Sequence, residues 1–161
     1  MAYQPSDLKS CGEVRLQHFD DGIDGSLTIA EVGKQVGFPI NRVYFITRMG
    51  TPDAVRGEHA HRALEQLIFC INGSFELEVD DGEKTARVLL NRPDRGIYLG
   101  PRLWHTMRRF SPECVILVLA SALYDESDYV RDYATFRTLV ADHDAQLQQA
   151  KQDLQDPPRA R

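Results

Sequence analysis

Short apolar runs, many of them alternating with polar residues, follow one another along the first three quarters of the chain. Between positions 75 and 79, Phe75, Leu77 and Val79 share one side of an extended strand, and the acidic residues between them share the other. Asn72-Gly73 and Asp81-Gly82 are dipeptides typical of tight hairpin turns. The pattern predicts strands at 14–20, 26–33, 41–48, 65–73, 74–82, 84–90, 96–100 and 114–121. Regular short strands of this kind indicate an all-β sandwich or barrel.

The period of the pattern changes near position 128, where it becomes helical. Four apolar residues then fall on one helical face: Tyr133, Phe136, Leu139 and Val140. The polar stretch 146–155 either extends this helix or frays, and Pro157-Pro158 ends it. Residues 1–12 are expected to be a loose lead-in. We therefore expect one domain over 1–161, with its core at about 13–140 and a C-terminal helix and tail at about 128–161.

Composition narrows the class of protein. The 161 residues are 42% apolar and 27% charged, as in an ordinary globular domain. The longest apolar run, 114–120, is far shorter than the roughly 20 residues of a membrane helix, and the N-terminal stretch lacks a signal peptide's apolar segment. The three cysteines form no CxxC motif, which favours a reducing compartment. We expect a cytoplasmic protein, and the net charge of −5 argues against a nucleic-acid partner.

The candidate chemistry lies in two histidine segments. In RGEHAHRALEQ, from Arg56 to Gln66, His59 and His61 are two residues apart and share one face of a strand. A third histidine, His105, lies in GPRLWHTM. Incidental placement of a lone histidine is common, but a same-face pair with a third in a matching segment favours a pocket. Such a pocket suits either a divalent metal, with Glu65 as the carboxylate ligand, or metal-free proton transfer. The spacing does not separate the two.

The order Gly-x-His-x-His, then Glu or Gln, then Gly-Pro-x-x-x-His resembles the paired motifs of the cupin superfamily. The resemblance implies an all-β double-stranded β-helix, or jelly-roll, barrel followed by the C-terminal α-helix. It also implies that the two motif strands face each other inside the barrel, which would bring His105 near His59 and His61.

A narrower resemblance covers about residues 20–140. It is carried by these stretches: GSL at 25–27, NRVYFI at 41–46, RGEHAHRALEQLIFCINGSFELEVDDG at 56–82, GIYLGPRLWHTM at 96–107 and CVILVLASALYDESDYVRDYATF at 114–136. Together they resemble the WxcM-like nucleotide-sugar 3,4-ketoisomerases, which act on dTDP-4-keto-6-deoxyglucose in the biosynthesis of deoxysugars such as those of O-antigen. The resemblance implies an isomerase without metal or other cofactor, a homodimer, and a dTDP-linked 4-keto-6-deoxy sugar as partner.

The resemblance also assigns catalytic roles. His59 would carry a proton from C3 to C4 through an enediol, and His61 would move the proton between the two oxygens. Tyr44 would hydrogen-bond the sugar or relay a proton, with core packing as the alternative.

Further residues are expected to bind substrate. Arg56 would pair with the diphosphate, unless it forms only a surface salt bridge. Gln66 would orient a histidine or a sugar hydroxyl, and Trp104 would either wall the pocket or touch the substrate. His105 slightly favours the galacto product over the gluco product. Asp24 occupies a position that influences which face of C4 receives the proton, although family members often carry Arg or Tyr there.

Four other positions carry weaker expectations. Arg42 is expected to form a structural ion pair. Tyr124 and Asp125 belong to a family stretch but have no assigned chemistry. Glu58 departs from the family's aromatic residue, and strand parity directs its side chain away from the histidines.

Three other functions remain open. A related 3,5-epimerase also has an RG-x-H motif, although the second histidine fits a ketoisomerase better. A metal-dependent cupin, such as a dioxygenase, would need a stoichiometric metal ion. A non-catalytic sensor would bind the nucleotide sugar without turnover.

Overall fold

The computed structural model describes residues 4–5, 7–51 and 53–155. The described residues form these elements in chain order: β1 (Gln4–Pro5), β2 (Cys11–Arg15), β3 (Gln17–Asp20), η1 (Gly22–Asp24), β4 (Ser26–Ile29), β5 (Arg42–Ile46), β6 (Arg56–His61), β7 (Gln66–Asn72), β8 (Phe75–Asp80), β9 (Thr85–Leu90), β10 (Arg95–Leu99), β11 (Trp104–Arg108), β12 (Val115–Ala120), η2 (Glu126–Asp128), β13 (Tyr129–Val130) and α1 (Tyr133–Gln155). The expectation of an all-β protein with one C-terminal helix is confirmed.

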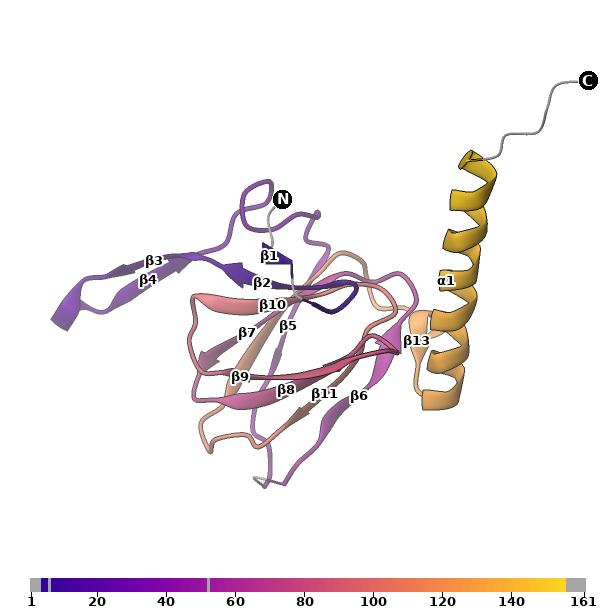
Figure 1. The fold of residues 1–161 in the computed structure, drawn as a ribbon. Coiled ribbons are helices and arrows are strands. Elements are labelled where there is room, and N and C mark those ends of the chain that lie inside the picture. The colour runs from indigo at the N-terminus through magenta and orange to yellow at the C-terminus, as the bar shows by residue number, and fades with distance from the viewer. Residues whose placement is uncertain (1–3, 6, 52, 156–161) are drawn as a thin grey trace, which may run out of the picture.

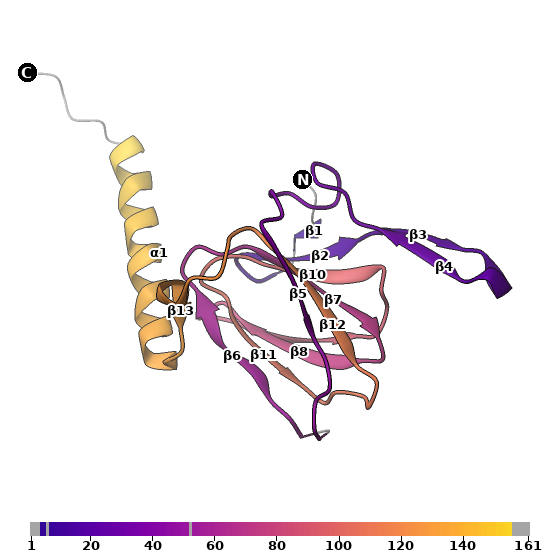
Figure 2. The same ribbon diagram turned by 180° about the vertical axis from the view of Figure 1, so that it is seen from behind.

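Two antiparallel sheets make up the barrel (Figure 1). One has the strand order β1-β2-β10-β7-β12-β5, and the other has the order β13-β6-β11-β8-β9. The hairpin β3–β4 projects beyond the barrel on the side opposite α1, as both views show (Figures 1 and 2). The described chain contains no helix that is both long and apolar enough to cross a bilayer.

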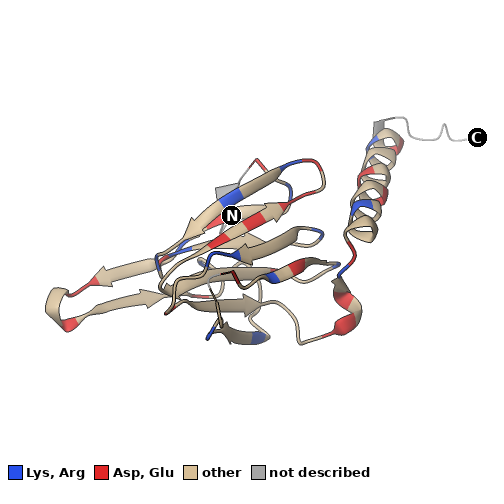
Figure 3. Cartoon of the chain, turned by 90° about the horizontal axis from the view of Figure 1, so that it is seen from below, with Lys and Arg blue, Asp and Glu red and all other residues tan. Residues whose placement is uncertain are grey.

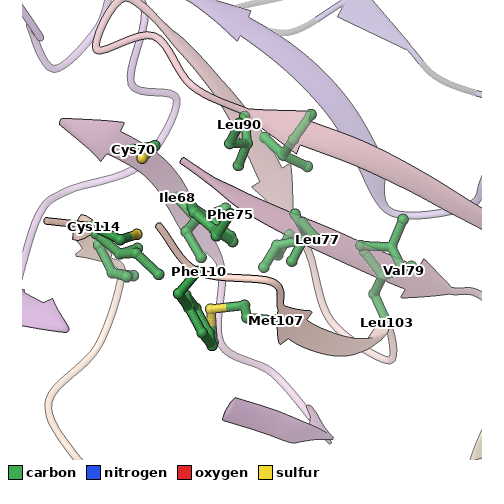
Figure 4. Packing of buried hydrophobic residues seen from close by; sticks show 14 residues of the cluster. Ile68, Cys70, Phe75, Leu77, Val79, Leu90, Leu103, Met107, Phe110 and Cys114 are labelled. Atoms are coloured by element: carbon green, nitrogen blue, oxygen red, sulfur yellow. The ribbon is translucent and has the colours of Figure 1, made fainter. Parts of the chain in front are cut away.

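The core lies between the two sheets (Figure 4). Phe75, Leu77 and Val79 of β8 are at most 1% exposed, and they belong to one cluster with Ile68 of β7 and Met107 of β11. The alternation predicted for β8 is therefore confirmed. Burying these side chains removes apolar surface from water, which is the main force that holds the two sheets together.

Both outer faces of the barrel are also covered. Val36 and Phe38, in the segment between β4 and β5, pack with Phe69 on the outer face of the first sheet. On the other sheet, Phe136 of α1 is fully buried in a cluster with Ala60 of β6. The helix thus rests directly against the strand that carries His59 and His61.

The helix begins later than its apolar pattern predicted. Residues 126–128 form a single 3-10 turn, and Tyr129-Val130 pair with β6 as a short strand. Backbone pairing with β6 holds this segment extended, so α1 starts only at Tyr133. It continues to Gln155, which shows that 146–155 extends the helix; the expected stop at 157–158 lies outside the described residues.

The N-terminal expectations need two corrections. The stretch 1–12 is not simply a lead-in, because it contains β1 and the start of β2. The single strand expected at 14–20 is two strands, interrupted at Leu16. The backbone N–H of Leu16 donates to the backbone carbonyl oxygen of Asp94. After this point the chain leaves the barrel to form the projecting hairpin (Figure 1).

Candidate active site

The two histidine segments form neighbouring strands of one sheet. β6 and β11 are antiparallel, and His105 lies directly opposite His59. The two motif strands are hydrogen-bonded side by side in one sheet, and therefore do not face each other inside the barrel as expected. The predicted proximity of the histidines is nevertheless correct, because residues opposite each other on adjacent strands have side chains in contact.

A β-bulge sets the direction of His59. The register shifts between His105 and Thr106, which pair with His59 and Gly57. Gly57 has φ +84°, and a Cβ there would lie 2.7 Å from the carbonyl oxygen of His105, so glycine is required. Glu58 is the extra residue of the bulge. Its side chain is exposed, 3.7 Å from Arg108, and so points away from the histidines as expected.

The three imidazoles form one cluster. Ring centroids are 4.9 Å apart for His59 and His61, and 4.5 Å apart for His59 and His105. The ring of Tyr129 lies 4.4 Å from that of His61. Burial lowers the pKa of all three histidines, that of His61 to about 4, so all are neutral at pH 7. A neutral imidazole can accept a proton, which is what a general base must do.

Hydrogen bonds fix the orientation of two of these rings. The Nδ1 of His59 lies 2.9 Å from the carbonyl oxygen of Gly57, which can only accept, so Nδ1 is the donor. The Nδ1 of His61 lies 2.9 Å from Oδ2 of Asp128. The Nε2 of His61 is buried and has no hydrogen-bond partner among the described residues.

Asp128 is the contact that sequence reasoning missed. It lies 67 positions from His61 and has no motif spacing to it. Its only signal in the sequence is its place in the family stretch YDESDY, in which Tyr124 and Asp125 have no assigned chemistry.

A cavity of about 640 Å³ opens beside the cluster. Four of the predicted residues line it: Tyr44, Arg56, His59 and His105. Arg42 and Arg131 line it as well, so three guanidinium groups surround the space. His61 lies deeper, on a cavity of about 190 Å³ that shares Arg42 and Tyr129 with the first.

Gln66 acts on Tyr44 and not on a histidine. Its Nε2 donates to the Tyr44 hydroxyl at 2.7 Å, and burial raises the pKa of that phenol to about 12. Tyr44 is therefore held as a neutral phenol at the cavity wall. The guanidinium of Arg42 lies 5.3 Å from the Tyr44 ring centroid, and its buried Nε has no hydrogen-bond partner among the described residues. The structural ion pair expected for Arg42 is therefore absent from the described part of the chain.

Three predicted residues lie away from the cavity. Trp104 packs against α1, with its ring 5.5 Å from that of Phe136, because its side chain points to the outer face of the sheet. Asp24 is exposed at the end of the projecting hairpin. Glu65 follows a turn that breaks the strand parity after His61, and it accepts a hydrogen bond from Tyr98 at 2.7 Å.

The geometry offers little to a metal ion. Within the described ranges, no three His, Cys, Asp or Glu side chains are arranged to hold one. Glu65, which sequence reasoning offered as a carboxylate ligand, is directed elsewhere. The arrangement instead suits proton transfer by neutral imidazoles beside an arginine-lined cavity.

Comparisons with known proteins find one matching family model and a similar enzyme. The family model FdtA, described as WxcM-like, C-terminal, matches residues 9–141. The TDP-4-oxo-6-deoxy-alpha-D-glucose-3,4-oxoisomerase of Aneurinibacillus thermoaerophilus is 45% identical over 119 residues, which are 73% of this chain and 84% of that protein.

Two solved structures are also similar. A mutant of the 3,4-ketoisomerase QdtA of Thermoanaerobacterium thermosaccharolyticum, in complex with TDP-4-keto-6-deoxyglucose, has a TM-score of 0.81 and 35% identity, covering 84% of this chain and 96% of that one. The TDP-quinovose 3,4-ketoisomerase WlaRB of Campylobacter jejuni has a TM-score of 0.77 and 40% identity, covering 81% and 99%.

Proposed function

Because the chain belongs to the FdtA family (WxcM-like, C-terminal), we propose that it is a TDP-sugar 3,4-ketoisomerase that moves the ketone of TDP-4-keto-6-deoxyglucose from C4 to C3. The family resemblance and the cupin barrel predicted from the sequence are both confirmed. The observation that carries the proposal is the cluster of His59, His61 and His105 beside a cavity lined by three arginines.

The reaction needs two proton movements and no net change in oxidation state. His59 removes the C3 proton, which the neighbouring C4 ketone acidifies, and an enediol forms. The same proton carrier then protonates C4, while the O3 proton moves to O4 by way of His61. The C3–H and O3–H bonds break, the C4–H and O4–H bonds form, and the carbonyl ends at C3. Low histidine pKa values keep both bases unprotonated at the start.

The arginines suit the nucleotide part of the substrate. A diphosphate carries negative charge on several oxygens, and guanidinium groups bind such oxygens with paired hydrogen bonds. Arg56, Arg42 and Arg131 line the same cavity as His59. If the diphosphate binds these arginines, the attached hexose would lie beside the imidazoles and next to the Tyr44 hydroxyl, which lines the same cavity.

The test is NMR of the purified protein with TDP-4-keto-6-deoxyglucose in deuterated water. A 3-keto product with deuterium at C4 is expected, and the C4 coupling constants are expected to give the galacto configuration, in line with His105. Exchange confined to C3 and C5 would indicate an epimerase, and binding without any change would indicate a sensor. His59→Asn should abolish turnover while TDP still binds, because the proton carrier alone is removed.

We also propose that the protein is a homodimer joined through the hairpin β3–β4. Ile23, at its end, is fully exposed, and Phe19 and Leu27 are each more than half exposed. The hairpin strands carry little charge, with the acidic residues toward the end (Figure 3). A two-stranded hairpin is at best marginally stable alone in water, so a second copy that covers it would stabilise it. Asp24, at the end of this hairpin, would then contact the partner subunit.

A reducing, cytoplasmic location is proposed on chemical grounds. The structure has no disulfide among Cys11, Cys70 and Cys114. Burial raises the pKa of the thiols of Cys70 and Cys114, which makes both poor nucleophiles.

A further inference from the structure

Asp128 is held in place by three contacts, one with the last residue of β6 and two with the turn that follows it. Its Oδ2 lies 2.9 Å from Nδ1 of His61, and its Oδ1 accepts the backbone N–H of Ala63 at 2.8 Å. Its own carbonyl oxygen accepts the backbone N–H of Arg62 at 2.9 Å. The carboxylate therefore cannot turn away from His61 without also giving up a backbone hydrogen bond.

These contacts determine which nitrogen of His61 carries the proton. An ionised carboxylate only accepts hydrogen bonds, so Nδ1 must be the donor. In a neutral imidazole the other nitrogen then has a free lone pair. That atom, Nε2, is the buried one without a partner among the described residues.

We propose that Asp128 is a positioning residue for the isomerase reaction, which holds His61 as the Nδ1–H tautomer so that Nε2 can receive the substrate's hydroxyl proton. The inference rests on the proposed function and adds a residue to it. As O3–H breaks and Nε2–H forms, His61 becomes an imidazolium, and the adjacent carboxylate stabilises that charge. When Nε2–H breaks and O4–H forms, the original state is restored. Asp128 keeps its charge throughout.

The variant Asp128→Asn separates this role from simple support of the turn. Its side chain has one oxygen, and the N–H of Ala63 requires that oxygen. The amide NH2 would then face Nδ1 of His61 and force the proton onto Nε2. Loss of the correct histidine tautomer in the His–Asp pair of a catalytic triad lowers kcat by about 10⁴. Loss of the hydrogen-bond partner of a metal-bound histidine lowers activity by about 10–100-fold. We expect kcat to fall at least about 100-fold, with the Kd for TDP within about threefold of the native value.

The matched control is Asp132→Asn, four residues further along the same segment. Asp132 caps α1 through the backbone N–H and the hydroxyl of Thr135, and asparagine performs the same capping. This variant should keep native turnover. Asp128→Glu restores a carboxylate and should recover part of the activity lost in Asp128→Asn.

Nitrogen-15 NMR of the ring of His61 gives a readout that needs no turnover. The native protein should show the proton on Nδ1, and Asp128→Asn should show it on Nε2. A native spectrum with the proton on Nε2, or an Asp128→Asn variant with kcat within threefold of native, would overturn the proposal. If the tautomer shifts as expected but the native protein does not isomerise the sugar, the proposed function fails and the positioning of His61 stands.

Discussion

At the scale of single residues, burial has shifted the pKa values of the three histidines and of Tyr44 in the site. His61 is 3% exposed, and Asp128 contacts only its Nδ1. The desolvation that lowers the histidine pKa outweighs the favourable effect of the nearby carboxylate. The same burial that prepares a base for the reaction must therefore make the fold sensitive to acid.

The stability of the fold should depend on pH through His61. Its pKa is about 4 in the folded protein and about 6.5 when the chain is unfolded. Between these values the unfolded chain binds more protons, so folded-state stability is complete above pH 6.5 and falls as the pH drops to about 4. The loss from this residue is on the order of 3 kcal/mol. Urea unfolding at pH 7, 5.5 and 4.5 measures it.

The control for this measurement is His61→Asn, which lacks the titrating ring but retains every carboxylate. Its stability should fall less steeply between pH 7 and 4.5 than that of the native protein. Identical slopes for the two proteins would assign the acid sensitivity to other groups.

Arg56 should contribute directly to nucleotide binding. It is exposed at the cavity beside His59, and a hydrogen bond to a charged group contributes about 1.5–3 kcal/mol. Arg56→Ala should therefore weaken TDP binding by about 10- to 100-fold in calorimetry. Arg87→Ala, which removes an exposed arginine paired with Glu78 on β8, should bind TDP as the native protein does. Equal affinities for the two variants would contradict the assignment.

At the scale of elements, β6 is the strand on which the site depends. It pairs with β11 on one edge and with β13 on the other. Asp128 lies in the 3-10 turn directly before β13, where it contacts His61 of β6. α1 covers the outer face of the same strand through Phe136 and Ala60. The hairpin β3–β4 is the opposite case, since it lies outside both sheets.

The hairpin should determine the oligomeric state. Replacing Phe19 and Leu27 by lysine places two charges on its apolar surface, which a partner copy cannot cover without desolvating them. Sedimentation should show a dimer for the native protein and a monomer for the double variant. Leu89→Lys on β9 replaces another exposed leucine of the barrel and should remain a dimer. A dimer in the double variant would place the interface elsewhere.

At the scale of the whole molecule, the net charge of −5 coexists with an arginine-lined cavity. The overall charge therefore does not indicate the ligand, because local guanidinium groups dominate the field at short range. In the cluster, Nδ1 of His59 donates to a backbone carbonyl and Nδ1 of His61 donates to a carboxylate, which leaves Nε2 of each neutral ring to accept a proton.

Turnover should accordingly be independent of added metal. Protein treated with EDTA and then desalted should isomerise the sugar within about twofold of the untreated rate, since His59 and His61 supply both proton carriers of the proposed reaction. Metal content measured on the same sample is the control for removal. Activity that disappears with a stoichiometric metal and returns with it would contradict the metal-free reaction.

The sequence by itself determined the features that depend on local pattern. Alternation placed Phe75, Leu77 and Val79 in the core, and the two-residue spacing of His59 and His61 placed their rings together, because a strand has a period of two. The motif stretches indicated the family, which the match to the family model confirms. Strand parity wrongly predicted the direction of Glu65, because a turn interrupts the strand after His61. The helical pattern wrongly predicted a helix start near 128, because backbone pairing with β6 holds that segment extended.

Only the tertiary structure decided the contacts between distant segments. The pairing of β6 with β11 in one sheet, the hydrogen bond between His61 and Asp128, and the direction of Trp104 toward α1 all depend on how sheets and helix pack. Such contacts leave no periodic signal, because each partner lies in a different element and the spacing between them is set by the intervening loops. The protonation of the histidines belongs with them, since it follows from burial, which no local pattern of polar residues specifies.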